Sequence, residues 1–512
     1  MRRPALALLL GCLLLVAGVS AIDGYSYYQT IEYAACDQEI HQQDIAIHRS
    51  TGTAYNETSG GLETWHIFVG DHCREDYGDI RFTNSTGAEL TYYLWPDYDS
   101  SSARFAVRLE GAASAGALTV HYGNPTAATT SDPSALPTVY TETGSHTYTV
   151  PDGVSSVAVL IVGGGGGGAG RDVSGGGGAG GLIFRPAYTV TPGSTLSVYI
   201  GAGGSGGVDT GSTPISDSTG ENGESTTFGD LIALGGGGGG HYLKPGVSGG
   251  SGGGAGREAS PNVGGSALQP LSESGGYGNA GGMGSGGSTT SHSGGGGGGA
   301  GEPGVNGVIN QAGRGGHGLS AVTIEGTEYS FAAFFGGLGV GQEVNGDLYF
   351  AGGGGGTTHR SGTANVGIGG YGGGGSGATP NGVSGTPNTG GGGGASRGTS
   401  NHGGAGGSGV VLIRAYSATP PAAITFSGEV ESDAPQPFPG LPLIPRDLTG
   451  NGLYTDINGN NRLDYNDLTV FFQNLAWAKT AQPIACFDFN GNGWLDYNDV
   501  ITLFTTISGE HP

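Results

Sequence analysis

A single glycine tract limits what this chain can fold into. The chain has 512 residues, of which 114 are glycine, and most of them lie between residues 163 and 409. Glycine loses more backbone entropy on folding than any other residue, so such a tract is often a disordered spacer. A collagen triple helix is excluded, because glycine does not recur strictly at every third position.

Apolar runs that lead directly into glycine runs favour order over a flexible spacer. Residues 157–162, 231–234 and 348–351 each precede a run of glycines, and the tract closes with the apolar residues 410–413. These runs are β-branched or alternating, which is typical of strands. We predict a β base from which glycine loops project. The loops would run as polyproline-II-like strands, rising about 3.1 Å per residue and hydrogen-bonded backbone to backbone.

The two ends of this tract resemble the glycine-rich domains of phage tail fibres and microbial surface proteins. The matching residues are 148–154 (YTVPDGV) and 406–414 (GGSGVVLIR). The resemblance implies one domain, residues 138–416, whose first and last strands pair. In such proteins the glycine loops form either a binding tip or a stiff spacer.

Charge and the first residues indicate an extracellular protein. The formal charge of −24 argues against a nucleic-acid partner and against binding to anionic lipid. Residues 1–21 read as a signal peptide, with Arg2 and Arg3, an apolar run and a small-residue cleavage site at Val19–Ala21. No other stretch is apolar and long enough to span a membrane. We expect a secreted, surface-associated chain.

Residues 22–136 are aromatic, polar and poor in glycine, and their short alternating runs predict an antiparallel β-sandwich. They resemble a domain of unknown function, frequent in archaeal and bacterial surface proteins, with a concanavalin-like sandwich. The matching residues are 79–82 (DIRF), 89–95 (ELTYYLW) and 120–125 (VHYGNP). The resemblance implies a polysaccharide as a possible partner. Trp65 and Trp95 would either stack on a sugar or, as large aromatics usually do, fill the core.

Cysteine usage suggests one disulfide. Cys36 and Cys73 are the only cysteines between residues 22 and 136, and in a secreted protein we predict that they pair. The bond would contribute about 3–4 kcal/mol in the chain-entropy model. Two buried thiols are the alternative. Cys486 has no obvious partner and is expected to be a small buried residue or an intermolecular cross-link.

Residues 417–445 are rich in proline, alanine and serine, and predict a semi-rigid extended linker. Residues 446–512 then carry two loops whose Asp and Asn spacing suits calcium. Calcium takes six to eight oxygens from carboxylates, amides and carbonyls in a loop that bends sharply at position 6. The predicted ligands are Asp456, Asn458, Asn460, Arg462, Asp464 and Asp467 in the first loop, and Asp488, Asn490, Asn492, Trp494, Asp496 and Asp499 in the second.

Details of the loops agree with two Ca²⁺ ions. Arg462 and Trp494 would contribute backbone carbonyls, and Asn461 and Gly493 stand at the bend. Apolar residues follow at helical spacing in both copies, at Leu468, Phe471, Phe472 and Leu475 and at Val500, Leu503, Phe504 and Ile507. The alternative is a pair of solvated Asn-Gly turns.

The duplicated loop–helix unit resembles a type I dockerin, or the dockerin-like tails of archaeal surface proteins. The resemblance implies a small α-helical calcium module that docks a cohesin-like or cell-surface protein. One departure bears on the partner. Loop positions 10 and 11, commonly Ser or Thr in dockerins, are Tyr465-Asn466 and Tyr497-Asn498 here, and these four residues are the candidates for a docking surface.

The chain is therefore predicted to be a mainly β, multidomain, secreted structural or adhesive protein with a calcium-dependent attachment module. An alternative is a component, catalytic or not, of an extracellular polysaccharide-degrading assembly of the cohesin–dockerin type. A third is ice binding by a flat face of the glycine-rich domain. No constellation of His, Ser, Cys or paired carboxylates indicates an enzyme.

Overall fold

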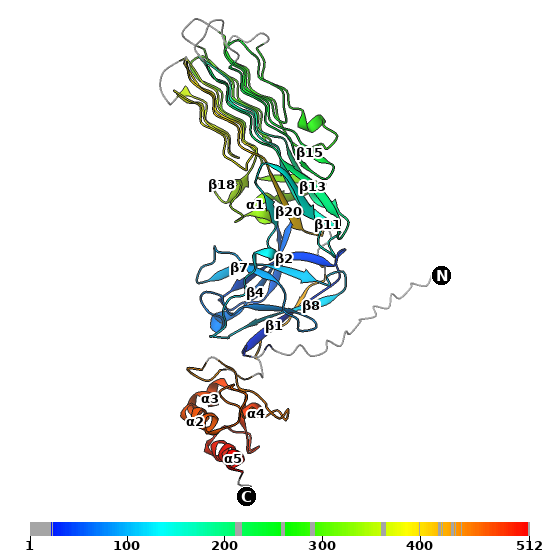
Figure 1. Cartoon of the computed structure of the whole chain (residues 1–512), viewed down its shortest axis with the longest axis vertical. Helices are drawn as coiled ribbons and strands as arrows, with labels where there is room; N and C mark the ends of the chain where they lie inside the picture. The colour runs from blue at the N-terminus through cyan, green and yellow to red at the C-terminus, as the bar shows by residue number, and fades with distance from the viewer. Residues whose placement is uncertain are drawn as a thin grey trace, which may run out of the picture.

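The computed structural model describes residues 22, 24–209, 218–257, 262–286, 292–359, 365–398, 400–417, 421, 423–431, 435, 437–441 and 443–509. The predicted signal peptide, residues 1–21, lies outside the described residues. The protein is mainly β, with several antiparallel sheets and a small helical region near the C-terminus. Figure 1 shows these parts following one another along the long axis, with the glycine runs at one end and the helices at the other.

The first part, called here the two-sheet domain, consists of two five-stranded sheets. One sheet has the order β21-β1-β8-β5, with β22 also paired to β1, and the other has the order β3-β4-β2-β7-β6. The strands of the first sheet are β1 (Tyr27–Tyr33), β5 (Arg81–Asn84), β8 (Gly116–Tyr122), β21 (Thr425–Phe426) and β22 (Val430–Glu431). Those of the second are β2 (Ile40–His48), β3 (Tyr55–Ser59), β4 (Leu62–Phe68), β6 (Tyr92–Leu94) and β7 (Ser102–Glu110).

Both sheets contribute to one hydrophobic core. Ile31 of β1 and Phe82 of β5 belong to the same buried cluster as Ile45 of β2 and Phe105 of β7. Alternation along β7 places Ala103, Phe105, Val107 and Leu109 on the inward face, as period-2 patterning requires. The expectation of purely antiparallel pairing is wrong at one place, because β2 and β4 run parallel, with Ile45 opposite Trp65.

A short segment of the predicted linker is also part of this domain. Residues 423–431, called here the strap, pair antiparallel with β1, so that Phe426 lies opposite Ile31 and Val430 opposite Tyr28. A segment expected to be an extended spacer therefore supplies edge pairing to the first sheet, about 400 residues away along the chain.

Two four-stranded sheets form the base of the glycine-rich domain. Their orders are β12-β11-β20-β9 and β10-β13-β14-β15. The strands are β9 (Thr138–Tyr140), β10 (Gly144–Thr149), β11 (Ser156–Val162), β12 (Leu182–Thr189), β13 (Thr195–Ile200), β14 (Thr226–Phe228), β15 (Leu231–Ala233) and β20 (Val410–Ala415). Strand β11 pairs with the closing strand β20, and Val162 lies opposite Val410, as the resemblance implied.

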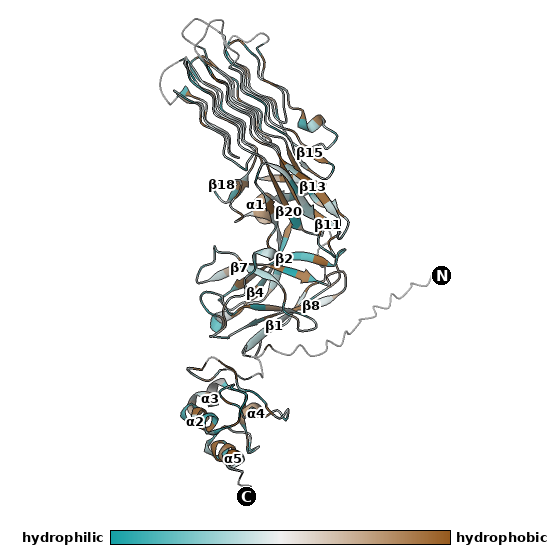
Figure 2. Cartoon of the chain, in the orientation of Figure 1, coloured by the Kyte–Doolittle hydropathy of each residue, from teal (hydrophilic) through white to brown (hydrophobic). Residues whose placement is uncertain are grey.

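Strand β11 is apolar throughout because both of its faces are covered. Val159 and Ile161 point into the core shared with the second base sheet, whereas Leu160 and Val162 point into a core on the opposite face. That opposite core is closed by helix α1 (Phe331–Phe335). The hairpins β16 (Ala321–Ile324) with β17 (Thr327–Ser330) and β18 (Gln342–Val344) with β19 (Asp347–Tyr349) flank this helix. Figure 2 shows the apolar residues gathered in these base strands and in the helices.

The glycine runs that leave the base sheets form an ordered bundle, called here the glycine bundle. Successive N–H groups of the run 163–168 donate to three different neighbouring runs in rotation. Gly164 and Gly167 donate to Glu224 and Glu221, Gly165 and Gly168 to Gly407 and Gly404, and Gly163 and Gly166 to Gly181 and Gly178. The carbonyls of this run accept from three further runs, as in Gly236 N–H to Gly164, Gly204 to Gly165 and Gly393 to Gly166. A repeat of three residues is that of polyproline II, here hydrogen-bonded on all sides.

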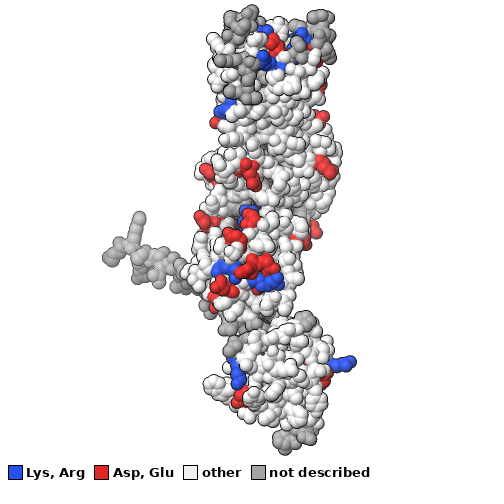
Figure 3. Space-filling model, turned by 90° about the vertical axis from the view of Figure 1, so that its left-hand side faces the viewer, with Lys and Arg blue, Asp and Glu red and all other residues white. Residues whose placement is uncertain are grey.

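Packing between the runs explains why glycine is required. A Cβ atom on Gly165 would lie 2.1 Å from the carbonyl oxygen of Gly391. Backbones that hydrogen-bond to six neighbours leave no room for a side chain at such positions. The glycine bundle is consequently almost uncharged on the face shown in Figure 3, where charged side chains gather over the two-sheet domain and near the distal end.

The helical region, residues 443–509, contains α2 (Tyr465–Gln473), α3 (Leu475–Ala481), α4 (Ile484–Phe487) and α5 (Tyr497–Ser508). The helices predicted after the two loops are α2 and α5. Phe471 and Leu503 are fully buried in their shared core, which also takes up Phe438 from the predicted linker. Phe472 and Phe504, however, are 53% and 42% exposed, so the core uses only part of each predicted apolar face.

Three short 3₁₀ turns complete the described elements, η1 (Gly70–His72), η2 (Pro133–Ala135) and η3 (Gln269–Leu271). No helix among the described residues combines the length and the apolar character that crossing a membrane requires.

Candidate functional site

The two Asp/Asn loops of the helical region have the same hydrogen-bond pattern. The carboxylate of Asp456 accepts from the N–H groups of Asn460 and Asn461, at 3.0 and 2.7 Å. Asp488 accepts in the same way from Asn492 and Gly493, at 3.0 and 2.7 Å. The sequence duplication is therefore a structural duplication.

The bend expected at position 6 is present in both loops. Asn461 has φ of 64° and Gly493 has φ of 81°, both in the left-handed region. Asn tolerates this conformation better than most residues with a side chain, which explains how the first loop turns without glycine at that position.

The last two acidic residues of each loop also serve as helix caps. Asp464 accepts from the N–H of Asn466, and Asp467 reaches back to accept from the N–H of Asp464 at 2.8 Å, which makes a reciprocal capping box. Asp496 and Asp499 repeat this arrangement at α5. Part of the predicted ligand pattern thus has a structural role at the helix N-termini.

The carboxylates of each loop are crowded together. Burial raises the pKa of Asp467, and the negative charges of Asp456 and Asp464 raise it further. The pKa of Asp499 is raised by burial and then by Asp488 and Asp496. Repulsion between carboxylates of one loop is the condition that a bound cation relieves.

The donor chemistry fits calcium only if neutral oxygens take part. No group of three or more His, Cys, Asp or Glu side chains in the described part of the chain could hold a metal ion alone. A calcium ion in the first loop would also need the side-chain oxygens of Asn458 and Asn460 and the carbonyl of Arg462, and in the second loop those of Asn490, Asn492 and Trp494. This mixture of carboxylate, amide and carbonyl oxygens is the ligand set that calcium takes in flexible loops.

The four docking-surface candidates lie at the starts of α2 and α5. Tyr465 and Tyr497 are 55% and 63% exposed. The ring of Tyr465 packs against Phe504, and that of Tyr497 against Phe472, with centroid separations of 6.2 and 6.0 Å. The N–H groups of Asn466 and Asn498 are used by the helix caps. The two copies thus contribute equivalent aromatic pairs to one surface.

The predicted disulfide is not formed. Cys36 and Cys73 are both free and buried in the core of the two-sheet domain. The Cys36 thiol donates to the carbonyl of Gln38 at 3.1 Å, and burial raises the pKa of Cys73 to about 12. Cys36 and Cys73 are therefore two buried thiols, which is the alternative to a disulfide. Cys486 is also buried, in the core of the helical region.

The tryptophans considered for sugar stacking are in the interior. Trp65 is fully buried, and Trp95 is 3% exposed with the Arg104 guanidinium 4.5 Å from its ring centroid. Neither presents a ring face to solvent, so any ligand of this domain must be bound elsewhere.

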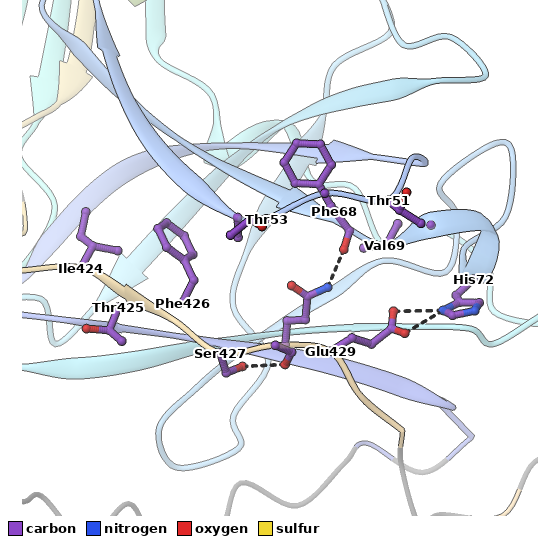
Figure 4. Close-up of a pocket in the computed structure, with 15 residues that line it drawn as sticks. Thr51, Thr53, Phe68, Val69, His72, Ile424, Thr425, Phe426, Ser427 and Glu429 are labelled. Carbon is purple, nitrogen blue, oxygen red and sulfur yellow. Dashed lines mark hydrogen bonds and ion pairs between the residues drawn. The ribbon is translucent and has the colours of Figure 1, made fainter.

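A cleft of about 600 Å³ opens where the strap crosses the two-sheet domain. One wall is the loop 51–54 with the end of β4, and the other is the strap itself, as Figure 4 shows. Phe426 contributes aromatic surface, while Glu429 of the strap faces His72 at 3.0 Å. Sequence reasoning missed this cleft, because the residues of its second wall are separated from the first by more than 350 positions.

A buried hydrogen-bond chain holds the acidic end of this cleft. The Tyr122 hydroxyl donates to Glu429 at 2.6 Å, and the amide of Gln29 donates to the Tyr122 hydroxyl at 2.8 Å and to the Phe68 carbonyl at 2.7 Å. Gln29 is 4% exposed and Tyr122 is fully buried. The Tyr122 hydroxyl therefore holds the Glu429 carboxylate in place. The remaining lone pairs of this carboxylate can accept hydrogen bonds from a molecule in the cleft.

Two family descriptions match the chain. Residues 141–416 match the glycine-rich domain family, and residues 76–148 match a domain of unknown function, DUF2341. No curated protein matches the sequence.

Proposed function

The chain belongs to the glycine-rich domain family, and from that premise we propose that it is a secreted or cell-surface structural protein that attaches through a calcium-binding C-terminal module. The observation that carries the structural role is the glycine bundle. A body whose backbone groups hydrogen-bond to six neighbours is stiff and costly to interrupt. Such a body suits a rod that holds two other parts at a distance.

We assign one Ca²⁺ to each Asp/Asn loop of the helical region. The crowded carboxylates at Asp467 and Asp499 and the left-handed bends at Asn461 and Gly493 support the assignment. Bound calcium would supply positive charge that neutralises these carboxylates and would fix the loop that precedes each helix. Its effect on the chain would be to hold α2 and α5 in register, since Asp464 and Asp496 cap those helices.

We further propose that the two-sheet domain is a concanavalin-like sandwich and that the helical region is a dockerin-like module. The duplicated aromatic pairs, Tyr465 with Phe504 and Tyr497 with Phe472, support a docking surface on that module for a cohesin-like or other cell-surface protein. Two equivalent copies of the surface would permit two docking orientations. The proposal assigns no reaction to the chain.

Calcium titration of the full chain tests this function. Isothermal titration should give two calcium ions per chain, reduced to one by Asp456→Ala or by Asp488→Ala. Calcium at 100 times its Kd should stabilise the helical region by about 2.7 kcal/mol for each bound ion, and a chelator should remove the effect. Glu343→Gln, an exposed acidic change in the glycine-rich domain, is the matched control and should leave the stoichiometry at two.

Two outcomes would contradict the proposal in different ways. Absence of calcium binding by the full chain would refute the metal assignment. Calcium binding with the same retention of cell-surface proteins in wild type and in a Tyr465→Ala/Tyr497→Ala chain would leave the metal in place and refute the docking surface.

A further inference from the structure

The cleft between the strap and the two-sheet domain has the size and the walls of a small-ligand site. Its volume of about 600 Å³ lies within the range of about 300–1,000 Å³ that ligand pockets usually have. Phe426 is half-buried and supplies flat apolar surface, whereas the Phe68 ring stacks on His48 and points away from the strap. The hydroxyl groups of Thr51 and Thr53 belong to the opposite wall, which gives the cleft a mixed apolar and hydroxylated character.

The charge of the cleft excludes anionic ligands. All 15 lining residues belong to the described chain, and none of them is Lys or Arg. The acidic member is Glu429, and the whole chain carries a formal charge of −24. Phosphates, sulfated glycans and uronic acids need cationic partners, so this surface would repel them.

The polar groups instead match a ligand with many hydroxyls. An ionised carboxylate only accepts hydrogen bonds, and Glu429 is held in place by Tyr122 and His72. A ligand hydroxyl can donate to Glu429 and accept from a threonine of the rim. The apolar face of the same ligand can lie against the Phe426 ring, which points into the cleft in Figure 4.

An extended peptide is a poorer match. Peptides commonly bind by adding a strand to an exposed sheet edge. Here β21 and β22 already occupy the edge of β1, with Phe426 paired to Ile31 and Val430 to Tyr28. The backbone groups that would recruit a peptide on this side of β1 are therefore in use.

We propose that this cleft binds a neutral sugar residue of an extracellular polysaccharide, with Glu429 accepting sugar hydroxyls and Phe426 contacting the sugar ring. The extracellular source of the ligand rests on the proposed function, but the site does not depend on the calcium loops. Because the strap supplies Phe426 and Glu429, a bound sugar would contact both walls and hold the strap against the first sheet.

Affinity electrophoresis of the full chain tests the proposal. The neutral probes are β-1,3-glucan, α-mannan and cellulose oligosaccharides, and the anionic probes are polygalacturonate and heparin. At least one neutral glycan should retard the wild-type chain, and the anionic glycans should not. Phe426→Ala and Glu429→Gln should each weaken the binding at least tenfold, whereas Tyr199→Ala, an exposed aromatic change in the glycine-rich domain, should leave it unchanged.

Each alternative outcome overturns a stated part of the inference. Retardation by no neutral glycan refutes the ligand class, and retardation by the anionic glycans alone refutes the charge argument. Equal binding by wild type, Phe426→Ala and Glu429→Gln refutes the location. Glu429→Gln conserves shape, so it remains informative if Phe426→Ala unfolds the strap. Repeating the assay in chelator separates the cleft from the calcium module, since sugar binding should persist when calcium is removed.

Discussion

The guanidinium of Arg414, in the closing strand of the glycine-rich domain, lies 2.9 Å from the carboxylate of Asp44, in strand β2 of the two-sheet domain. The two side chains are 1% and 2% exposed. Arg414 also donates to the carbonyl of Gln42 at 3.1 Å. This buried pair therefore joins two parts of the chain that the sequence suggests are separate domains.

Removing one partner of this pair should be costly. Arg414→Met leaves the Asp44 carboxylate buried without its cation, and we expect a loss of about 3–5 kcal/mol in urea unfolding. The double change Arg414→Met/Asp44→Leu should cost less than the single one, because no charge is left unpaired. Asp71→Asn breaks an exposed pair with Arg49 and should change stability by less than about 0.5 kcal/mol. A loss no larger for Arg414→Met than for Asp71→Asn would show that the pair does not join the domains.

A single methyl group should disrupt the glycine bundle. In Gly165→Ala the new Cβ meets the Gly391 carbonyl, so two glycine runs must separate, at an expected cost of about 3 kcal/mol or more. Gly286→Ala places its methyl group in open space and is the control. Thermal unfolding followed by circular dichroism should show a lower melting temperature for the first variant and little change for the second. Equal melting temperatures would mean that the runs are not packed as described.

Acid should destabilise the two-sheet domain through a buried histidine. Burial lowers the pKa of His121 to about 4, and its imidazole lies 2.9 Å from the Thr83 hydroxyl. The unfolded chain takes up this proton near pH 6.5, and the folded chain does so only near pH 4. The stabilisation is thus complete above pH 6.5 and is lost progressively as the pH falls toward 4, by on the order of 3 kcal/mol.

Comparing the pH dependence of unfolding in wild type and His121→Gln separates the contribution of His121 from that of the other histidines. His121→Gln should flatten the fall in unfolding free energy between pH 6.5 and 4, whereas the exposed His402→Gln should not. His41, whose pKa burial lowers to about 3, is present in all three chains and cancels in the comparison. An identical pH dependence in wild type and His121→Gln would show that His121 is protonated normally in the folded chain.

The cysteines of the two-sheet domain should react only after unfolding. Burial raises the pKa of both Cys36 and Cys73, so neither is a thiolate at pH 8. Iodoacetamide should leave the native chain unmodified and should alkylate both residues in urea without any reductant. Mass spectrometry decides the point, because a requirement for reductant would reveal the disulfide that the structure does not contain.

The sequence predicted the parts of the fold that local patterns determine. Strand β11 is recognisable because residues 157–162 are apolar and end in glycine, and helices α2 and α5 follow from Phe471 and Leu503 at helical spacing. The bends at Asn461 and Gly493 follow from loop spacing alone. Each of these features depends on neighbours within about ten residues.

The remaining features depend on contacts that no local pattern contains. The parallel pairing of β2 with β4 and the pairing of the strap with β1 depend on contacts throughout the domain. These contacts decide at which sheet edge each strand pairs. A two-residue strand such as Thr425–Phe426 is too short to show an alternating apolar and polar pattern. The prolines nearby are typical of a linker, which is what the sequence predicted there. The helical period predicts that the Phe472 side chain points inward. In the structure α2 and α5 share one core, and Phe472 is half-exposed at its margin.

The pairing of β11 with β20 also determines how the protein would carry mechanical load. The chain enters and leaves the glycine bundle through these two adjacent strands, which are joined from Val157 opposite Ala415 to Val162 opposite Val410. Tension between the bundle and the helical region would reach the strap first. The strap pairs with β1 over only two residues at each of β21 and β22, so its hydrogen bonds would break a few at a time. Past the strap, the same tension would pull β20 lengthwise against β11, so that six residue pairs resist in shear together. The strap would therefore yield at low force and the base strands only at high force.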